Sequence, residues 1–385
     1  MYIAMLGRQP SIGMAELERV FGDVTWFSEN VAAIQTESFD VTRLGGTLKA
    51  GKVVNELSGD WRRASEQLVK TYSAKWGNFD GKITLGISAY GFKVSSRDVQ
   101  KTGIILKQRL RQKNVSLRLI PNAEPAHNTA TSHHNKLGLS NNKVELLIVR
   151  NKNGKVIIAE SVGAQNITAL AARDQGRPKR DAFVGMLPPK LALIMVNLAS
   201  PSGEKPTILD PFCGTGVILQ EAALLGYNVY GTDLADKMIE YSKQNMSWLA
   251  QKYNTSSDYV IEQGDAMDTK WRRPIDAVVA EGYLGQPFSA PPSPSKLIEV
   301  RGNCDHIMST FLQNIGSQIE SGTQLAIAVP AWRSTDGSFT HLPLITKLAQ
   351  LGYEQINFKN VRTPELLYYR EDQVVARELL VLKKI

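Results

Sequence analysis

The chain has 385 residues, 43% of them hydrophobic and 21% charged, and a formal net charge of +8 at pH 7. A chain of this length is expected to form two or three domains, each with its own core. The sequence contains no apolar run of about 18 residues, and charge follows too soon after its first residues for a secretory signal. These features exclude a membrane-spanning protein, so we expect a cytosolic protein without a membrane partner.

Cysteine and histidine usage excludes two further classes of protein. Cys213 and Cys304 are the only cysteines, too few for a disulfide framework or a cysteine zinc site. Among the five histidines only His133 and His134 are adjacent, and no cysteine or acidic residue accompanies them at metal-ligand spacing. The sequence therefore predicts no metal site.

The positive charge is concentrated in one part of the chain. Residues 82–190 hold 19 Lys and Arg against 6 Asp and Glu, a net charge of +13, which leaves −5 for the remainder. Such clustering favours a module that binds a polyanion such as nucleic acid, joined to a separate catalytic module. A solvated, lysine-rich surface is the simpler alternative.

The first segment, residues 1–78, has the pattern of a small α+β domain without a recognisable chemical motif. Alternating and helical periodicity predicts the following elements: a strand at 2–7, a helix at 11–22, a strand pair within 26–37, a strand at 51–57 and a helix at 61–76.

Residues 79–167 are predicted to form a second domain, built on strands and a basic amphipathic helix at 95–114. Ile104, Ile105, Leu106 and Leu110 are available to face its core. Short strands are expected at 136–139, 144–150 and 155–162. Such a helix can lie along phosphates without reading bases, or be simply exposed. The residues predicted to bind RNA from this helix are Lys101, Lys107, Arg109 and Arg111.

A basic linker follows at residues 168–189. Gly176 and Pro178 interrupt it, and an apolar helix is predicted after it at 190–198. The linker either contacts both the polyanion and the ligand of the next domain or serves only as a hinge. Its predicted RNA-binding residues are Arg173, Arg177, Lys179 and Arg180.

The stretch from Thr207 to Asp233 predicts a β-α-β unit of the nucleotide-binding kind. A strand at 207–209 leads into a turn with Gly214 and Gly216, then a helix at 217–225 and a second strand that ends at Asp233. Later elements are expected as a helix at 307–319, a strand at 323–332 and a closing antiparallel hairpin within 355–382.

The side chains of the turn indicate which ligand it binds. Asp210 at its mouth would repel a dinucleotide pyrophosphate but attract the ammonium and sulfonium of S-adenosylmethionine. Cys213 and Thr215 fit in the turn beside the glycines, which let the backbone pass close to a ligand. Asp233, followed by Leu234, could accept both ribose hydroxyls, although NAD would satisfy Asp233 equally well. We therefore predict S-adenosylmethionine as the cofactor.

Three stretches resemble one enzyme family. Residues 173–192, the Asp-Pro-Phe-Cys-Gly-Thr-Gly string at 210–216 and residues 366–382 resemble the tRNA guanine-N2 methyltransferases that act on the guanosine at position 10. The resemblance implies an α/β fold in which a Rossmann-like class I methyltransferase domain at 190–385 is preceded by an α+β ferredoxin-like domain and a THUMP domain. In that family the THUMP domain grips the acceptor end of tRNA.

The resemblance also implies roles for residues near the carboxyl ends of later strands. Asp265 resembles the residue that accepts the adenine amino group, with the backbone of Ala266 beside it. Residues 281–284, Glu-Gly-Tyr-Leu, stand where the family has Asp-Pro-Pro-Tyr. Because the guanine amine is a poor nucleophile, it needs proton acceptors and an aromatic face, and Glu281 and Tyr283 are predicted to supply them as the catalytic pair.

The function predicted from the sequence is S-adenosylmethionine-dependent formation of N2-methylguanosine in tRNA, at position 10. Methylation of guanine in ribosomal RNA is one alternative, and a non-catalytic tRNA-binding protein on the same scaffold is another, because both prolines of the family motif are replaced. The proline- and serine-rich run at 286–296 would wall the pocket, contact RNA or form a surface insertion. The number of methyl groups transferred and the need for a partner subunit stay open.

Overall fold

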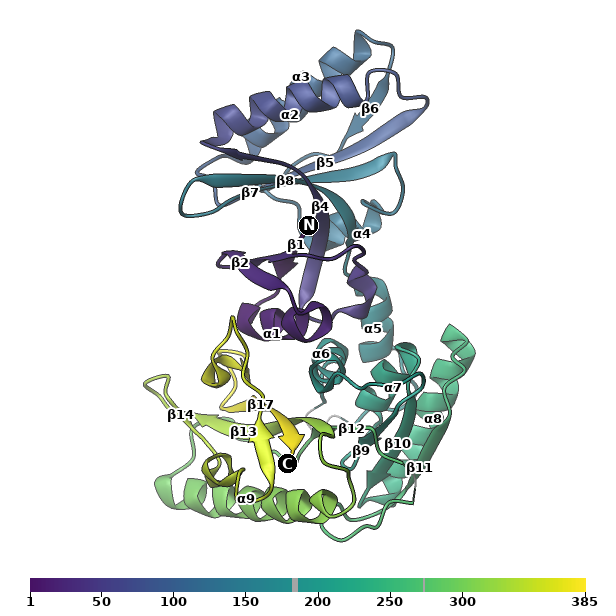
Figure 1. Ribbon diagram of the computed structural model, residues 1–385, viewed down its shortest axis with the longest axis vertical. Helices are drawn as coiled ribbons and strands as arrows, with labels where there is room; N and C mark the ends of the chain where they lie inside the picture. Colours follow the sequence, from purple (N-terminus) through teal and green to yellow (C-terminus); the bar gives the residue numbers. More distant parts are fainter. Residues whose placement is uncertain (182–185, 273) are drawn as a thin grey trace. The chain divides into compact units, whose positions relative to one another are not determined.

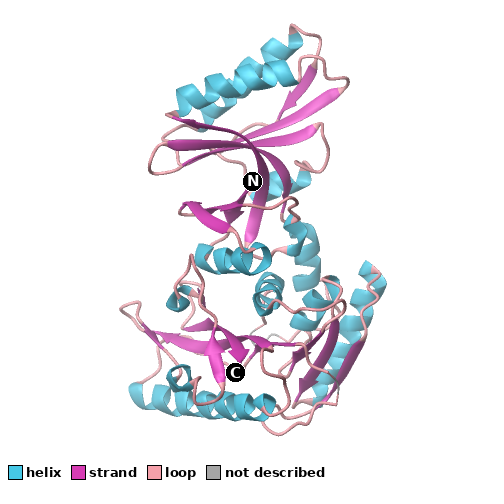
Figure 2. Cartoon of the chain, viewed as in Figure 1, coloured by secondary structure: helices cyan, strands magenta, loops and turns pink. Residues whose placement is uncertain are grey.

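The computed structural model describes residues 1–181, 186–272 and 274–385, which group into two compact units. Unit 1 comprises residues 1–10 and 21–169, and unit 2 comprises residues 11–20 and 170–385. Both units combine sheets with helices (Figures 1 and 2), which confirms the predicted α/β class.

Unit 1 is built on one eight-stranded sheet. Its strand order is β2-β3-β1-β4-β8-β7-β5-β6. The long strand β4 pairs with β1 on one side and with β8 on the other. The two predicted N-terminal domains thus share a sheet, and their ferredoxin-like and THUMP-like character stays a prediction. The strands are β1 (Tyr2–Leu6), β2 (Val24–Ser28), β3 (Val31–Ile34), β4 (Thr47–Ser58), β5 (Lys82–Tyr90), β6 (Ser116–Leu119), β7 (Lys143–Arg150) and β8 (Lys155–Ala164).

Helices α2 (Trp61–Lys75) and α3 (Ser96–Arg111) pack beside each other on the sheet of unit 1 (Figure 1). A capping box starts α3, in which Ser95 and Asp98 satisfy each other's backbone N–H groups. Leu106 points into the core, but Ile104 and Ile105 are 44% and 37% exposed. The expectation that these two isoleucines face the core is wrong, because the helical period turns them outward.

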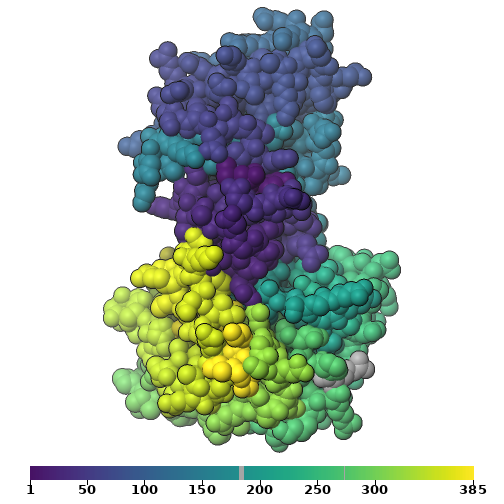
Figure 3. Space-filling model, viewed as in Figure 1, coloured from purple at the N-terminus to yellow at the C-terminus, as the bar shows by residue number. Residues whose placement is uncertain are grey.

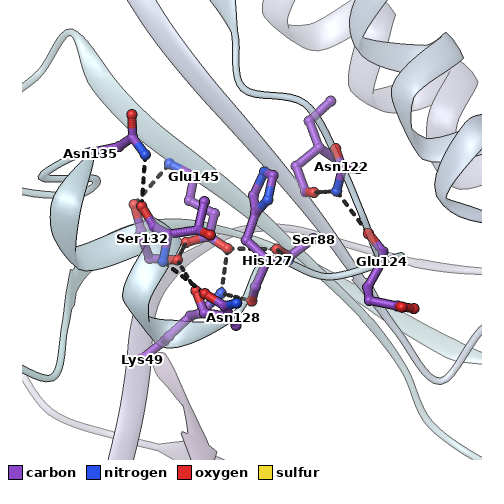
Figure 4. Close-up of polar contacts among 12 residues, drawn as sticks. Lys49, Ser88, Asn122, Glu124, His127, Asn128, Ser132, Asn135 and Glu145 are labelled. Carbon is purple, nitrogen blue, oxygen red and sulfur yellow. Dashed lines mark hydrogen bonds and ion pairs between the residues drawn. The ribbon is translucent and has the colours of Figure 1, made fainter. Parts of the chain in front are cut away.

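A short helix, α4 (Thr129–His134), is fixed to this sheet by a buried polar network (Figure 4). The Glu145 carboxylate accepts hydrogen bonds from Lys49 Nζ at 2.6 Å, Ser88 Oγ at 2.5 Å and Ser132 Oγ at 2.6 Å. A buried charge requires such partners, and they come from β4, β5 and α4. The strand predicted at 136–139 is wrong, since a turn follows α4 there.

Unit 2 contains a nine-stranded sheet whose main path is β11-β10-β9-β12-β13-β17-β15. The strands from β11 to β13 run parallel, and β17 lies antiparallel between β13 and β15. This confirms the predicted Rossmann-like sheet with its closing antiparallel strand near the C-terminus. Residues near the C-terminus, coloured yellow, reach the surface of this unit (Figure 3). The strands are β9 (Thr207–Asp210), β10 (Asn228–Asp233), β11 (Tyr259–Gln263), β12 (Ala277–Glu281), β13 (Gln324–Arg333), β14 (Phe339–Thr340), β15 (Tyr353–Gln355), β16 (Leu367–Tyr368) and β17 (Val375–Lys384).

Helices cover both faces of this sheet, with α6 (Pro189–Ala199), α7 (Val217–Leu224) and α8 (Asp236–Tyr253) on one face and α9 (Pro294–Gly316) on the other (Figure 1). The helix predicted at 307–319 begins much earlier, because Ser293 caps it and Pro294 occupies its first turn. Proline and serine therefore mark a helix start here. In the described part of the chain, no helix is both long and apolar enough to span a membrane.

Helix α1 (Pro10–Phe21) lies early in the sequence, but its residues 11–20 group with unit 2. Glu16 accepts a hydrogen bond of 2.7 Å from Asn197 Nδ2, and Arg19 Nε donates to the Leu198 carbonyl oxygen at 3.1 Å. These contacts join α1 to α6. The remaining short helices are α5 (Ile167–Gln175), η1 (Val41–Arg43), η2 (Pro343–Lys347) and η3 (Thr363–Glu365).

Candidate active site

A pocket of about 790 Å³ lies in unit 2 at the carboxyl ends of the parallel strands. The order of these strands reverses between β9 and β12, and crevices at such points are where open α/β sheets bind ligands. The loop before β17 and the start of β17 complete its wall. Of the predicted cofactor and catalytic residues, the following line it: Asp210, Cys213, Gly214, Thr215, Asp233, Leu234, Asp265, Ala266, Glu281 and Tyr283.

The remaining predicted residue, Gly216, shapes the turn without lining the pocket. Gly214 and Gly216 have φ values of +50° and +79°, in the left-handed region that favours glycine. A Cβ atom on Gly216 would lie 2.7 Å from Ser242 Oγ, so α8 passes too close for any side chain there. The sequence predicted that both glycines let the backbone pass close to a ligand. In the structure, Gly216 instead lets the turn pass close to helix α8.

Asp233 holds the turn in place as well as facing the pocket. Its Oδ2 accepts a hydrogen bond of 2.9 Å from Gly214 N, and its Oδ1 accepts one of 3.0 Å from Ala235 N. Each carboxylate oxygen keeps a lone pair for a further donor. Leu234, 68% exposed, offers apolar surface in the same pocket, where Asp265 and the buried Ala266 form the neighbouring wall.

Asp210 is the most buried acidic group of the pocket, with 1% of its surface exposed. One hydrogen bond reaches its carboxylate, from Phe212 N at 3.2 Å. Burial raises the pKa of Asp210 well above its usual value, and the nearby Asp233 and Glu281 carboxylates raise it further. A pocket with this floor disfavours anions and favours a positively charged ligand.

Cys213 has a packing role in the turn. Burial raises the pKa of its thiol well above the usual value, and Ser242 Oγ donates to its sulfur at 3.7 Å. A Cβ atom on Gly231 would approach the Cys213 Cβ to 3.1 Å, so space here is limited. Its place in the pocket wall is that of a small, unreactive side chain, as the sequence indicated.

Glu281 ends strand β12 and receives a hydrogen bond from Arg377 Nε of β17. Both side chains are largely buried, with 16% and 10% exposed. Burial raises the pKa of Glu281, and the charge of Arg377 opposes that shift. The sequence analysis did not identify Arg377, which lies 96 residues away and carries no local motif. Its position within the stretch 366–382 of the resemblance was the available signal.

The two residues after Glu281 explain the changed motif. Gly282 N donates to the Ala328 carbonyl oxygen at 2.9 Å, a bond that a proline cannot make. A Cβ atom there would lie 2.4 Å from Met308 Sδ, so any larger residue would require the Met308 side chain to move. Tyr283 is 43% exposed and lines the pocket, where it presents an aromatic ring to a ligand.

The predicted RNA-binding residues have two different fates. Lys101, Lys107, Arg109 and Arg111 are exposed on α3, as a phosphate-binding face requires. Arg173 is buried instead and forms a two-bonded ion pair with Glu221 of α7, at 2.5 and 2.9 Å.

Arg177 is also buried, with 3% exposed, and its Nη2 donates to Met186 Sδ at 3.1 Å. The prediction that Arg173 and Arg177 bind RNA is therefore wrong. The buried Glu221 carboxylate requires a counter-charge, which Arg173 provides. Burial likewise takes the Arg177 side chain away from the surface.

Arg180 is exposed and Lys179 is partly exposed, so both stay candidates for RNA contact. Asn245 of α8 bonds to the backbone N and O of Lys179 at 2.9 and 3.0 Å, and also to the Thr215 carbonyl oxygen at 2.9 Å. The linker is thus tied to the glycine turn. Residues 182–185 of the predicted linker lie outside the described residues.

In the part of the chain that the structure describes, no three His, Cys, Asp or Glu side chains come together as a metal site. His133 and His134 lie side by side, with ring centroids 5.3 Å apart, and His133 Nε2 lies 3.1 Å from Thr168 Oγ1.

Known proteins share sequence with part of the chain. The chain is 34% identical over 160 residues to a tRNA (guanine(10)-N2)-dimethyltransferase of Methanothermobacter thermautotrophicus, covering 41% of this chain and 43% of that protein. It is 35% identical over 148 residues to the same-named protein of Pyrococcus abyssi, covering 38% and 39%. The alignments therefore span about two fifths of each relative.

The fold comparison covers the whole chain. The crystal structure of TrmN from Thermus thermophilus superposes with a TM-score of 0.55 and 14% identity, covering 100% of this chain and 99% of that chain. This likeness shows a common fold along the entire length. Residues 177–297 match the family model described as RMKL-like, methyltransferase domain. The resemblance found in the sequence is thereby confirmed for residues 177–297, which include most of the residues that line the pocket.

Proposed function

We propose that the protein uses S-adenosylmethionine to methylate the N2 amine of guanine in tRNA, at position 10, in the cytoplasm. The observation that carries the proposal is the buried Asp210 carboxyl with Asp233 and Glu281 around it, in a methyltransferase domain. The names of the relatives, tRNA (guanine(10)-N2)-dimethyltransferases, support the choice of substrate.

The residues of the pocket fit this cofactor. A buried carboxyl that receives a single backbone hydrogen bond, as Asp210 does, gains a counter-charge when an ammonium or sulfonium binds. Asp233 offers its remaining lone pairs to the ribose hydroxyls. Leu234, Asp265 and Ala266 form the part of the wall that suits an adenine, with apolar surface beside a polar edge.

When bound, S-adenosylmethionine supplies a methyl group on a positively charged sulfur. The guanine amine that would receive this methyl group must also lose one proton. Glu281 is the carboxylate placed to accept that proton, because it lines the pocket and burial raises its pKa. Tyr283 would stack on the base and fix its orientation.

The tRNA would be held through its phosphates by the exposed basic face of α3 in unit 1. Removing two of its charges, Lys107→Ala with Arg111→Ala, should weaken tRNA binding and flatten its salt dependence. The slope of log K against log salt should fall by about 0.9 per lost phosphate contact. A matched control removes two exposed charges from the neighbouring α2, Arg62→Ala with Lys70→Ala. Equal effects of both pairs would contradict a specific role for α3.

The direct test incubates the protein with radiolabelled S-adenosylmethionine and either unmodified tRNA or ribosomal RNA, followed by mass spectrometry of the nucleosides. We expect N2-methylguanosine from tRNA and none from ribosomal RNA. The Glu281→Gln protein should still bind tRNA through the basic face of α3 but transfer at least 100-fold less methyl, which is the usual effect of losing a general base. Label in ribosomal RNA alone, or no label with intact cofactor binding, would contradict the proposal.

A further inference from the structure

We propose that Arg377 and Glu281 act together to read the Watson–Crick edge of the target base, so that Arg377 sets the specificity for guanine over adenine. This inference rests on the proposed function, because it concerns the base whose amine receives the methyl group. No sequence motif points to Arg377, which the fold brings to the pocket from the antiparallel strand β17.

The sheet register explains how these two side chains meet. Glu281 on β12 is paired with Ala328 on β13, and Arg377 on β17 is paired with Pro330, two residues further along β13. Directly paired residues, and residues two apart on one strand, point to the same face of a sheet. The Arg377 side chain can therefore cross β13 above the small Ala328 and reach the Glu281 carboxylate.

The contact between them uses only part of each group. Arg377 Nε donates to Glu281 Oε1. Among the described residues, neither side chain makes another hydrogen bond. The two Nη amino groups of Arg377 and the Oε2 atom of Glu281 keep their hydrogen-bonding capacity. Both residues line the pocket, so these free groups are available to a ligand within it.

The neighbouring charges do not compete for this arginine. Glu378, the next residue of β17, points to the opposite face, where its Oε2 lies 2.6 Å from His341 Nδ1. Asp210 lies close enough to Glu281 to feel its charge, but its own carboxyl is buried and receives Phe212 N. Arg377 therefore bonds to Glu281 and can also donate hydrogen bonds to a ligand in the pocket.

Side by side, the pair presents a donor from an Arg377 amino group and two acceptors, the free Oε2 of Glu281 and the second lone pair of its Oε1. Guanine offers the complementary order, with the O6 acceptor followed by the N1–H and N2–H donors. Adenine offers a donor at N6 and an acceptor at N1. Its N6 donor would face the donors of Arg377, and its N1 acceptor would face an acceptor oxygen of Glu281. A site of buried polar groups rejects such a mismatch strongly, because the groups are left unpaired.

The test compares two tRNA substrates that differ only at the target base, guanosine or 2,6-diaminopurine. The latter keeps the N2 amine but carries an amine at position 6 and no N1–H. The wild-type protein should prefer guanosine in kcat/KM, and Arg377→Met should reduce that preference by about 10-fold or more. Arg377→Lys, which retains a donor, should lie between them. Comparing the ratio across variants cancels the intrinsic reactivity of the two amines.

Two controls separate recognition from folding. Arg362→Met removes an exposed arginine whose ion pair with Glu365 lies outside the pocket lining, and should leave the preference unchanged. Affinity for S-adenosylmethionine, measured by calorimetry, should be the same in the Arg377 variants as in the wild type. An unchanged guanosine preference in Arg377→Met would overturn the inference, since a merely structural ion pair predicts that result.

A binding assay decides the matter if Arg377→Met methylates neither substrate. Inosine keeps O6 and N1–H but lacks the N2 amine, whereas 2-aminopurine keeps that amine and lacks O6. The wild type should bind inosine-containing tRNA more tightly than 2-aminopurine-containing tRNA, and Arg377→Met should reduce this difference to what the N1–H contact with Glu281 supplies. An undiminished difference would overturn the role of Arg377, whereas a wild-type protein that methylates no RNA would instead refute the proposed function.

Discussion

Replacing Asp210 with Asn removes a buried negative charge while keeping the shape of the side chain. In the ligand-free protein this change should raise the stability of unit 2 at neutral pH, because burial raises the pKa of Asp210. The unfolded chain loses this proton near pH 4, before the folded chain does. The folded state therefore binds more protons above that pH, and the free energy of unfolding falls as the pH rises.

The size of the effect follows from the linkage. Over the range between the unfolded and the folded pKa, the wild type should lose up to about 1.4 kcal/mol of stability per pH unit relative to Asp210→Asn. For a domain of this size, 1 kcal/mol corresponds to about 2–4 °C in melting temperature. In calorimetric scans between pH 5 and pH 8, the melting temperature of the variant minus that of the wild type should increase as the pH rises. Asp258→Asn, which removes an exposed carboxylate from the same unit, is the control.

Cofactor binding should change in the opposite direction. Loss of the charged hydrogen-bonding group should cost about 2 kcal/mol, or about 30-fold in the dissociation constant for S-adenosylmethionine. Titration calorimetry at one pH measures this directly. Equal pH dependence of melting in both proteins, or equal affinity for the cofactor, would refute the assignment of Asp210 as the buried acid that receives the cation.

Other substitutions test the surroundings of the pocket. Arg173→Met should destabilise unit 2 by about 3–5 kcal/mol in urea denaturation, because it leaves the Glu221 carboxylate buried without its partner; the further change Glu221→Met should recover most of that loss, and a full-size loss in the double variant would contradict this account. Gly216→Ala should lower both thermal stability and cofactor affinity, since φ is +79° and Ser242 leaves no space. Gly302→Ala, in the open middle of α9, should instead stabilise the protein by up to about 1 kcal/mol.

Local sequence was sufficient for the β-α-β unit at the pocket. Gly214 and Gly216 mark positions with positive φ. Asp210 and Asp233 are the last residues of strands β9 and β10. Each of these signals arises from neighbouring residues and from backbone geometry. The strand and helix bounds of 207–233 were therefore predicted to within a few residues.

Side-chain fate in the basic linker could not be read in the same way. Arg173, Arg177, Lys179 and Arg180 are equally basic in sequence, but the first two are buried and the last is exposed. The difference comes from Glu221, a carboxylate on the inner side of α7 that attracts Arg173 into the interior. The composition of a segment gives its charge but does not show whether a distant residue, here Glu221, will pair with that charge in the interior.

The sequence by itself determined the class of the fold, the glycine turn with its acidic mouth and the basic face of α3, because each depends on residues close together in the chain. Tertiary structure alone decided that Arg377 reaches Glu281 across β13 and that Gly282 occupies a position where a proline would lose a backbone hydrogen bond. Such contacts depend on strand order and register over 96 residues. No local sequence pattern predicts a contact between residues so far apart in the chain, because the strand order and register of the whole sheet determine which side chains share a face.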